Sequence, residues 1–271
     1  MRRPTTARWT VRLAILATAV LAVALGAAPA SAITHGDLDG DGHPYVGLMV
    51  AKDADGNPLW RCSGTLISST VYLTAGHCTQ APAASADIWF GSDLTDAEAI
   101  DFPAHGDAHG TTYVHPDYDP ADFTVRDVGV VVLDAALPMA EYGALPALDT
   151  FDTLGKKAAT FTTVGYGVQR MFPPAAEWKI ESLRLRMVAT PRLLQVNSNT
   201  TGDYSLLLSV NANTGGACHG DSGGPNFIGD SNVVGAVTSS SKSDLCKSST
   251  RVFRMDRAWA LDWVEGFLTT P

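Results

Sequence analysis

Three residues of the types used in nucleophilic catalysis stand in distinctive short motifs. Ser222 lies in the run GDSGGP, His77 lies in LTAGHC, and Asp127 opens the run DVGVVVL. A serine hydroxyl is too weakly acidic to attack an amide at neutral pH unless a base lies beside it and donors stabilise the oxyanion. The three motifs therefore predict a nucleophile, a general base and a carboxylate that orients the base.

Each motif also has a purely structural interpretation when it is taken alone. GDSGGP is compatible with an ordinary glycine-rich turn, His77 with a structural histidine, and Asp127 with the aspartate of a turn that starts a strand. The catalytic interpretation adds a physical reason to each. Glycines on both sides of Ser222 let backbone N–H groups converge, a cysteine beside His77 offers a rigid support, and a buried Asp127 needs a partner.

The elements that would position these residues read mainly as short strands. The 271 residues include 25 glycines and 15 prolines, and 45% are hydrophobic, which is enough for one large core or two small ones. Strand-like runs are expected at 46–51, 64–67, 71–74, 128–133, 158–164, 205–210 and 233–238. A helix is expected at 258–268, with Ala258, Leu261 and Val264 on one apolar face. This pattern predicts an all-β barrel or sandwich domain with a terminal helix.

The first 32 residues have the features of a secretory signal peptide. Four arginines precede or flank the apolar run 13–28, and Ala30-Ser31-Ala32 fits a cleavage site before Ile33. An uncleaved membrane anchor is the alternative, although the run is short for a spanning helix. We expect a secreted, extracellular protein that does not stay in the membrane after cleavage. The whole chain has a formal charge of −9, and loss of the four arginines leaves −13, which argues against nucleic acid as a partner.

Four cysteines in an exported chain suggest two disulfides, but their spacing alone leaves all three pairings open. The four are Cys62, Cys78, Cys218 and Cys246, and they form no C-x-x-C pair that would favour zinc. The run 37–42, DLDGDG, copies half of a calcium loop, yet Leu48 stands where the bidentate glutamate should be. His105, His109 and His115 lack a complete ligand set. We therefore predict no metal and no cofactor.

The three motifs, in the order His, Asp, Ser, resemble the trypsin/chymotrypsin-like serine endopeptidases over nearly all of 33–268. The likeness looks closest to short bacterial secreted members. It implies two antiparallel six-stranded β-barrels, at 33–145 and 146–271, with a C-terminal helix and the triad between the barrels. It also implies the disulfides Cys62–Cys78 and Cys218–Cys246, a protein or peptide substrate, and a monomer.

The resemblance implies a role for each motif residue. Ser222 would be the nucleophile, His77 the base and then the acid, and Asp127 the group that orients His77. The N–H groups of Gly220 and Ser222 would form the oxyanion hole. Thr238 takes the place of a serine that usually contacts the catalytic aspartate.

The resemblance also suggests how the enzyme is activated. In the family a new N-terminus, usually IVGG, pairs with the aspartate before the nucleophile. Here the match is ITHG from Ile33, and the partner would be Asp221. We expect signal removal itself to create the active N-terminus. The alternative is that Ile33 is only a frayed chain end.

The expected substrate pocket contains Gly216, Ala217, Thr238, Ser239, Ser240 and Arg251. Gly216 stands where tryptic members carry an aspartate, so cleavage after lysine or arginine is not expected. Arg251 replaces a glycine of the pocket wall, and its guanidinium could select an acidic P1 side chain. A small or apolar P1 residue is the alternative, with Arg251 directed to solvent or to a carboxylate such as Asp244.

Two other functions use the same residues. A silent homologue could act as a binding module, but such proteins usually lose a triad residue and none is lost here. An esterase is the second alternative, because Gly220, Ser222 and Gly224 superficially match a G-x-S-x-G elbow. That elbow requires the order Ser, Asp, His, so the hydrolase-elbow interpretation fails.

Overall fold

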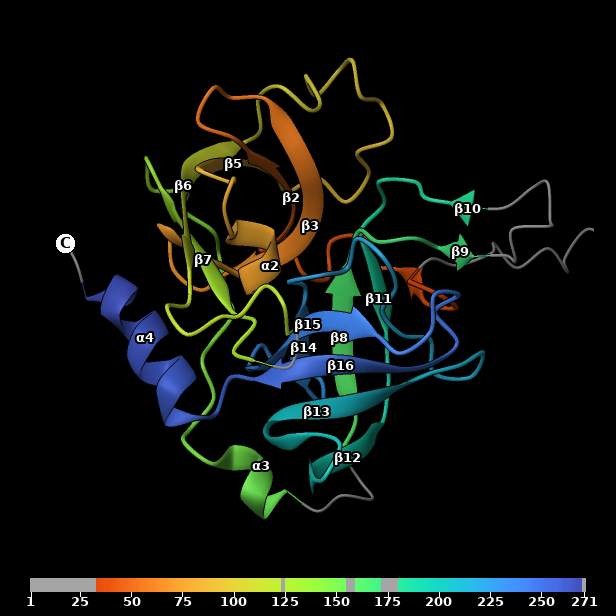
Figure 1. Cartoon of the computed structure of the whole chain (residues 1–271). Helices are drawn as coiled ribbons and strands as arrows, with labels where there is room; N and C mark the ends of the chain where they lie inside the picture. The colour runs from red at the N-terminus through yellow and green to blue at the C-terminus, as the bar shows by residue number, and fades with distance from the viewer. Residues whose placement is uncertain (1–32, 123–124, 155–158, 172–179, 270–271) are drawn as a thin grey trace, which may run out of the picture. The chain divides into compact units, whose positions relative to one another are not determined.

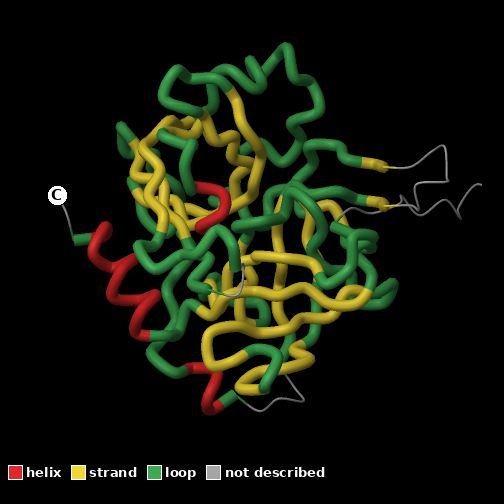
Figure 2. The backbone as a smooth tube through the Cα atoms, in the orientation of Figure 1, coloured by secondary structure: helices red, strands yellow, loops and turns green. Residues whose placement is uncertain are grey.

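The structure, a computed structural model, describes residues 33–122, 125–154, 159–171 and 180–269. The expected signal peptide lies outside these residues. Within them, no helix is long and apolar enough to cross a membrane. The described chain is almost entirely β-structure with three short helices (Figures 1 and 2), which confirms the predicted all-β fold.

Six antiparallel strands close into a barrel in the order β2-β3-β4-β7-β6-β5. Their bounds are β2 Val46–Lys52, β3 Pro58–Leu66, β4 Val71–Thr74, β5 Ser85–Trp89, β6 Ala108–Val114 and β7 Gly129–Leu133. β2 is buried along its whole length, and Trp89 and Tyr72 are among the largest buried side chains. β-Branched and aromatic residues suit these strands because they pack well on a pleated surface.

A second sheet has eight strands in the order β1-β11-β8-β14-β15-β16-β13-β12. Their bounds are β1 Asp37–Leu38, β8 Phe161–Gly165, β11 Met187–Ala189, β12 Leu193–Ser198, β13 Gly202–Val210, β14 Pro225–Ile228, β15 Val234–Ser241 and β16 Ser248–Arg254. A separate hairpin pairs β9 (Arg170–Met171) with β10 (Ile180–Glu181). Figure 1 shows the strands of the second sheet from β8 to β16 in green and blue.

The second sheet is not the closed six-stranded barrel that the resemblance implied. Six of its strands run from β8 to β12, and the two ends meet only at one isolated bridge, between Thr160 and Arg192. β11 and β1 extend the sheet beyond β8. Because β11 already occupies the free edge of β8, a full ladder between β8 and β12 does not form, and the sheet is a half-barrel.

The helices are α2 (Gly76–Thr79), α3 (Thr150–Thr153) and α4 (Ala258–Leu268). α4 has the bounds expected from the sequence, but Ala260, Leu261 and Val264 form its buried face, while Ala258 is exposed. The helix docks on the loop that precedes β7, where Trp263 lies 5.1 Å from the His115 ring. α4 thereby joins β16, which precedes it in the chain, to the barrel loop that leads to Asp127.

The calcium-like run at 37–42 serves a different purpose. Asp39 accepts a hydrogen bond from Arg186 Nε at 2.8 Å and pairs with His43 Nδ1 at 2.6 Å. Arg186 is buried and also donates to the carbonyl oxygens of Phe90 and Gly40. The carboxylate of Asp39 is thus used in a buried ion pair that ties the N-terminal segment to β11.

Candidate active site

The local structure around His77 holds its ring against Asp127. His77 lies on α2, and the adjacent Cys78 forms a disulfide with Cys62 of β3, with 6.2 Å between their Cα atoms. The backbone N–H of His77 donates to Asp127 Oδ1 at 2.7 Å, and its Nδ1 lies 2.8 Å from Oδ2. Asp127 is completely buried just before β7. Two contacts to one buried carboxylate fix both the position and the orientation of the imidazole.

A third donor reaches Asp127 from the second sheet, and it is not the residue that the sequence predicted. Ser239 Oγ donates to Asp127 Oδ2 at 2.6 Å. The hydroxyl of Thr238 instead accepts from Asn226 Nδ2 at 2.9 Å. The pairing of β15 with β16 slips between Thr238 and Ser240, so Ser239 sits in a bulge, and a bulge re-aims the side chain it carries. The role predicted for Thr238 therefore belongs to Ser239.

The GDSGGP loop is folded against β3 of the barrel. Ser63 donates its N–H to Ser222 O at 2.7 Å and its hydroxyl to Gly220 O at 2.9 Å. Gly223 has a φ of +80°, and a Cβ there would collide with Thr74 Oγ1 and with Ser63 O. Only glycine fits this position. Ser222 itself is partly exposed.

The N–H groups of Gly220 and Ser222 take no part in the described hydrogen bonds that hold this loop. Gly220 has a φ of +92°. Among the described residues, neither of these two N–H groups donates to a protein acceptor, although those of Asp221, Gly223 and Gly224 all do. Two uncommitted donors beside a serine hydroxyl are the chemical requirement of an oxyanion hole.

Asp221 is buried directly beneath the loop. Its Oδ1 accepts a hydrogen bond from the N–H of Gly167 at 2.7 Å, and its Oδ2 accepts one from the N–H of Cys218 at 2.8 Å. Burial raises the pKa of Asp221 to about 6, although these hydrogen bonds and the charge of Arg61 oppose the rise. Ile33 is also buried, in a small cluster with Met187 and Ala189. The described contacts include none between Ile33 and Asp221, so their pairing stays a prediction.

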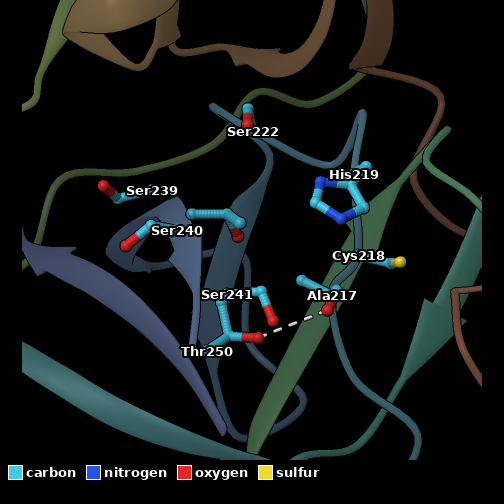
Figure 3. A pocket seen from close by; sticks show the side chains of 9 residues that line it. Ala217, Cys218, His219, Ser222, Ser239, Ser240, Ser241 and Thr250 are labelled. Atoms are coloured by element: carbon cyan, nitrogen blue, oxygen red, sulfur yellow. Dashed lines mark hydrogen bonds between the residues drawn. The ribbon is translucent and has the colours of Figure 1, made fainter. Parts of the chain in front are cut away.

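A pocket of about 200 Å³ opens beside Ser222 (Figure 3). Of the residues predicted to form it, Ala217, Thr238, Ser239 and Ser240 line it. Gly216 does not, and neither does Arg251. The sequence reasoning missed Cys218, His219, Ser241 and Thr250, which line it as well. Thr250 donates its hydroxyl to Ala217 O at 3.3 Å, so these two lining residues are in direct contact (Figure 3).

Arg251 faces away from the pocket because side chains alternate along a strand. Its neighbour Thr250 on β16 points into the pocket, so Arg251 points to the opposite face of the sheet. It is 8% exposed and donates to Ser205 Oγ at 2.7 Å and to Thr200 O at 2.9 Å. The guanidinium therefore serves the packing of β13 and β16 and does not line the pocket beside Ser222.

The second disulfide joins Cys218, in the pocket wall, to Cys246, with 5.3 Å between their Cα atoms. Both disulfides are those that the resemblance implied. In the described part of the chain, the one His/Cys/Asp/Glu cluster with metal-ligand spacing is Cys62, His77 and Cys78. Both of its sulfurs are in the disulfide, so this cluster does not offer thiolate ligands.

Comparison with known proteins places this chain in a family. The family model described as Trypsin matches residues 40–259. A chymotrypsin of Phaedon cochleariae is 27% identical over 82% of this chain and 76% of its own length. Serine protease 1 of Drosophila melanogaster is 25% identical over 82% of this chain and 79% of its own length. These relatives are insect proteins, so they lend no support to the expected likeness to bacterial members.

Solved structures show the same fold at lower sequence identity. A structure named HL collagenase covers 88% of this chain and 99% of its own, with a TM-score of 0.67 and 17% identity. Human heparin binding protein covers 84% of this chain and 92% of its own, with a TM-score of 0.62 and 19% identity. The chain belongs to the trypsin family and is a serine-type endopeptidase.

Proposed function

We propose that peptide hydrolysis by this chain proceeds through Ser222, His77 and Asp127. The observation that carries the proposal is the buried Asp127 carboxylate, which holds His77 through two contacts and takes a third from Ser239. A carboxylate so placed keeps Nδ1 protonated and leaves Nε2 as the basic atom.

In the proposed reaction, Ser222 Oγ attacks the carbonyl carbon of the scissile bond while its proton passes to His77 Nε2. The oxyanion that forms accepts hydrogen bonds from the N–H groups of Gly220 and Ser222. The C–N bond then breaks, and His77 gives its proton to the leaving amine. Water, deprotonated by His77, hydrolyses the acyl-enzyme and regenerates the Ser222 hydroxyl.

A fluorophosphonate probe and casein test this assignment together. Wild-type protein should be labelled and should cleave casein, and Ser222→Ala should lose both activities. Labelling without proteolysis would favour the esterase, and absence of labelling would favour the binding module. A Ser231→Ala variant is a matched control, because that hydroxyl lies in an exposed turn and donates to Ile228 O.

The pocket supports a small, uncharged P1 side chain. Its described lining consists of hydroxyl-bearing and small residues together with His219, and includes no carboxylate or guanidinium group. Thr250 projects a branched side chain where a glycine would leave the pocket deeper. An acidic P1 preference through Arg251 is not proposed, because that side chain is engaged on the other face of the sheet.

We also propose that the chain is exported and becomes active when cleavage leaves Ile33 as the first residue. Asp221 is buried without an ion-pair partner among the described residues, and such a carboxylate gains most from a cation. The ammonium of Ile33 would supply it. N-terminal sequencing of the active secreted protein tests this, since a start well after Ile33 would refute it.

A further inference from the structure

We propose that Arg61, assisted by Arg184, forms a subsite that binds a carboxylate side chain on the leaving-group side of the scissile bond. This inference rests on the proposed function, because it assumes that the substrate crosses Ser222. It concerns a group that the triad, the oxyanion hole and the P1 pocket do not use.

The position of Arg61 follows from the packing of β3 on the GDSGGP loop. Ser63, two residues along β3, bonds both Ser222 O and Gly220 O. A Cβ built on Gly220 would lie 3.7 Å from Arg61 Nε and 3.9 Å from its Nη2. The guanidinium is therefore next to one of the two proposed oxyanion donors.

The two sides of Ser222 differ in what they can hold. The pocket for the P1 side chain is walled by Ala217, His219 and the strand segment 238–241. Arg61 instead comes from the barrel, beside the Cys62–Cys78 disulfide. Because a peptide must run across the nucleophile, residues that follow the scissile bond leave over the side opposite the pocket. Arg61 is a charged group that lies beside Gly220 and outside the lining of the pocket.

Within the described part of the chain, no carboxylate forms an ion pair with Arg61. Among the described residues, its one hydrogen bond is to Ser182 Oγ, which leaves further N–H groups of the five on a guanidinium. Asp221 attracts it, but both oxygens of that carboxylate already accept backbone N–H groups. Burial and the nearby charge of Arg184 lower the pKa of Arg61, as expected for a cation that lacks a direct anionic partner.

Arg184 adds a second cation that is held in place by neutral groups. Its Nε and Nη2 donate to Leu94 O and Thr95 O, both at 2.7 Å, and its guanidinium lies 4.7 Å from the centre of the Phe102 ring. Arg61 and Arg184 repel each other, and this repulsion costs stability even though the chain as a whole has a formal charge of −9. An anion between them would relieve that repulsion, and a guanidinium matches the geometry of a carboxylate.

Amidated fluorogenic peptides with one fixed sequence up to P1 test the subsite. A single Asp or Asn is placed at P1′, P2′ or P3′, and amidation separates a side-chain carboxylate from the carboxylate of a chain end. At one of these positions we expect kcat/KM to be about tenfold higher for Asp than for Asn, as for a partly screened charged hydrogen bond. This Asp/Asn ratio should fall in 0.5 M NaCl because salt screens exposed charges.

Variants assign the effect to its residue. Arg61→Gln should bring the Asp/Asn ratio to about 1, and Arg61→Lys should restore part of it because a charge returns. Arg192→Gln makes the same change in net charge at an exposed side chain and should keep the wild-type ratio. The salt dependence of the wild-type ratio tests the same interaction without any substitution.

The possible results separate this inference from the proposed function. If wild-type protein cleaves all peptides with equal kcat/KM at low salt, the subsite is refuted and the triad assignment stands. If Arg61→Gln retains the wild-type Asp/Asn ratio, the assignment to Arg61 is refuted. If no peptide is cleaved and the fluorophosphonate does not label Ser222, the proposed catalytic mechanism fails first.

Discussion

Substitution of Ser239 by alanine removes one of three donors to the buried carboxylate of Asp127. The Ser239 hydroxyl lies 2.6 Å from Oδ2, and the residue is only 5% exposed, so water does not readily replace it. A hydrogen bond to a charged group contributes about 1.5–3 kcal/mol. We expect the free energy of unfolding to fall by about that amount.

The effect on catalysis should be smaller than the full hydrogen-bond energy. Asp127 carries its charge in both the ground state and the transition state, and only differential interactions change the rate. Two contacts to His77 remain in the variant. Looser positioning of the imidazole should lower kcat/KM by about tenfold, which corresponds to about 1.4 kcal/mol.

Thr238→Val is the matched control, because the sequence assigns the contact with Asp127 to Thr238 and the structure does not. Its hydroxyl accepts from Asn226, so its loss should lower stability by about 1–2 kcal/mol and leave kcat/KM for a P1 alanine substrate within about twofold. The assays are amide hydrolysis and urea unfolding, the latter in a Ser222→Ala background to prevent autolysis. A larger loss of kcat/KM in Thr238→Val than in Ser239→Ala would refute the reasoning.

Three further predictions concern the pocket, the activation pair and the terminal helix. Arg251→Ala should leave the P1 preference unchanged but lower the free energy of unfolding by about 3 kcal/mol, since it leaves buried partners unpaired. Thr250→Gly should raise kcat/KM for P1 phenylalanine over P1 alanine by about tenfold. A peptide library measures the P1 preference and urea unfolding measures the stability, and a changed P1 preference in Arg251→Ala would contradict the prediction. The Asp221 carboxyl should titrate near pH 6 before processing and at lower pH once cleavage has freed the α-amino group of Ile33. ¹³C NMR of labelled aspartate in Ser222→Ala protein follows this titration, and an unchanged titration after processing would exclude the pairing. Burial lowers the pKa of His115, so the unfolded chain binds the extra proton and the free energy of unfolding should fall as the pH drops below about 6.5. His115→Phe should weaken this dependence in urea titrations, and an unchanged dependence would show that His115 is not responsible for it.

The sequence determined the features that depend on short-range chemistry. GDSGGP requires left-handed backbone at Gly220 and Gly223, and both glycines have it. The apolar run after Asp127 became β7, and α4 has the expected bounds. The two cysteine pairs were implied by the resemblance and are the ones that form, although the spacing of the cysteines alone left all three pairings open.

Tertiary structure decided every feature that depends on a one-residue register between strands. A bulge at Ser239 passed the contact with Asp127 from Thr238 to its neighbour, and alternation along β16 turned Thr250 into the pocket and Arg251 away from it. A shift of one residue in a strand moves a side chain to the other face, yet it changes neither composition nor local propensity. The closing of the second sheet was likewise settled by which strand took the free edge of β8. Such choices come from long-range pairing, which no single segment of the sequence encodes.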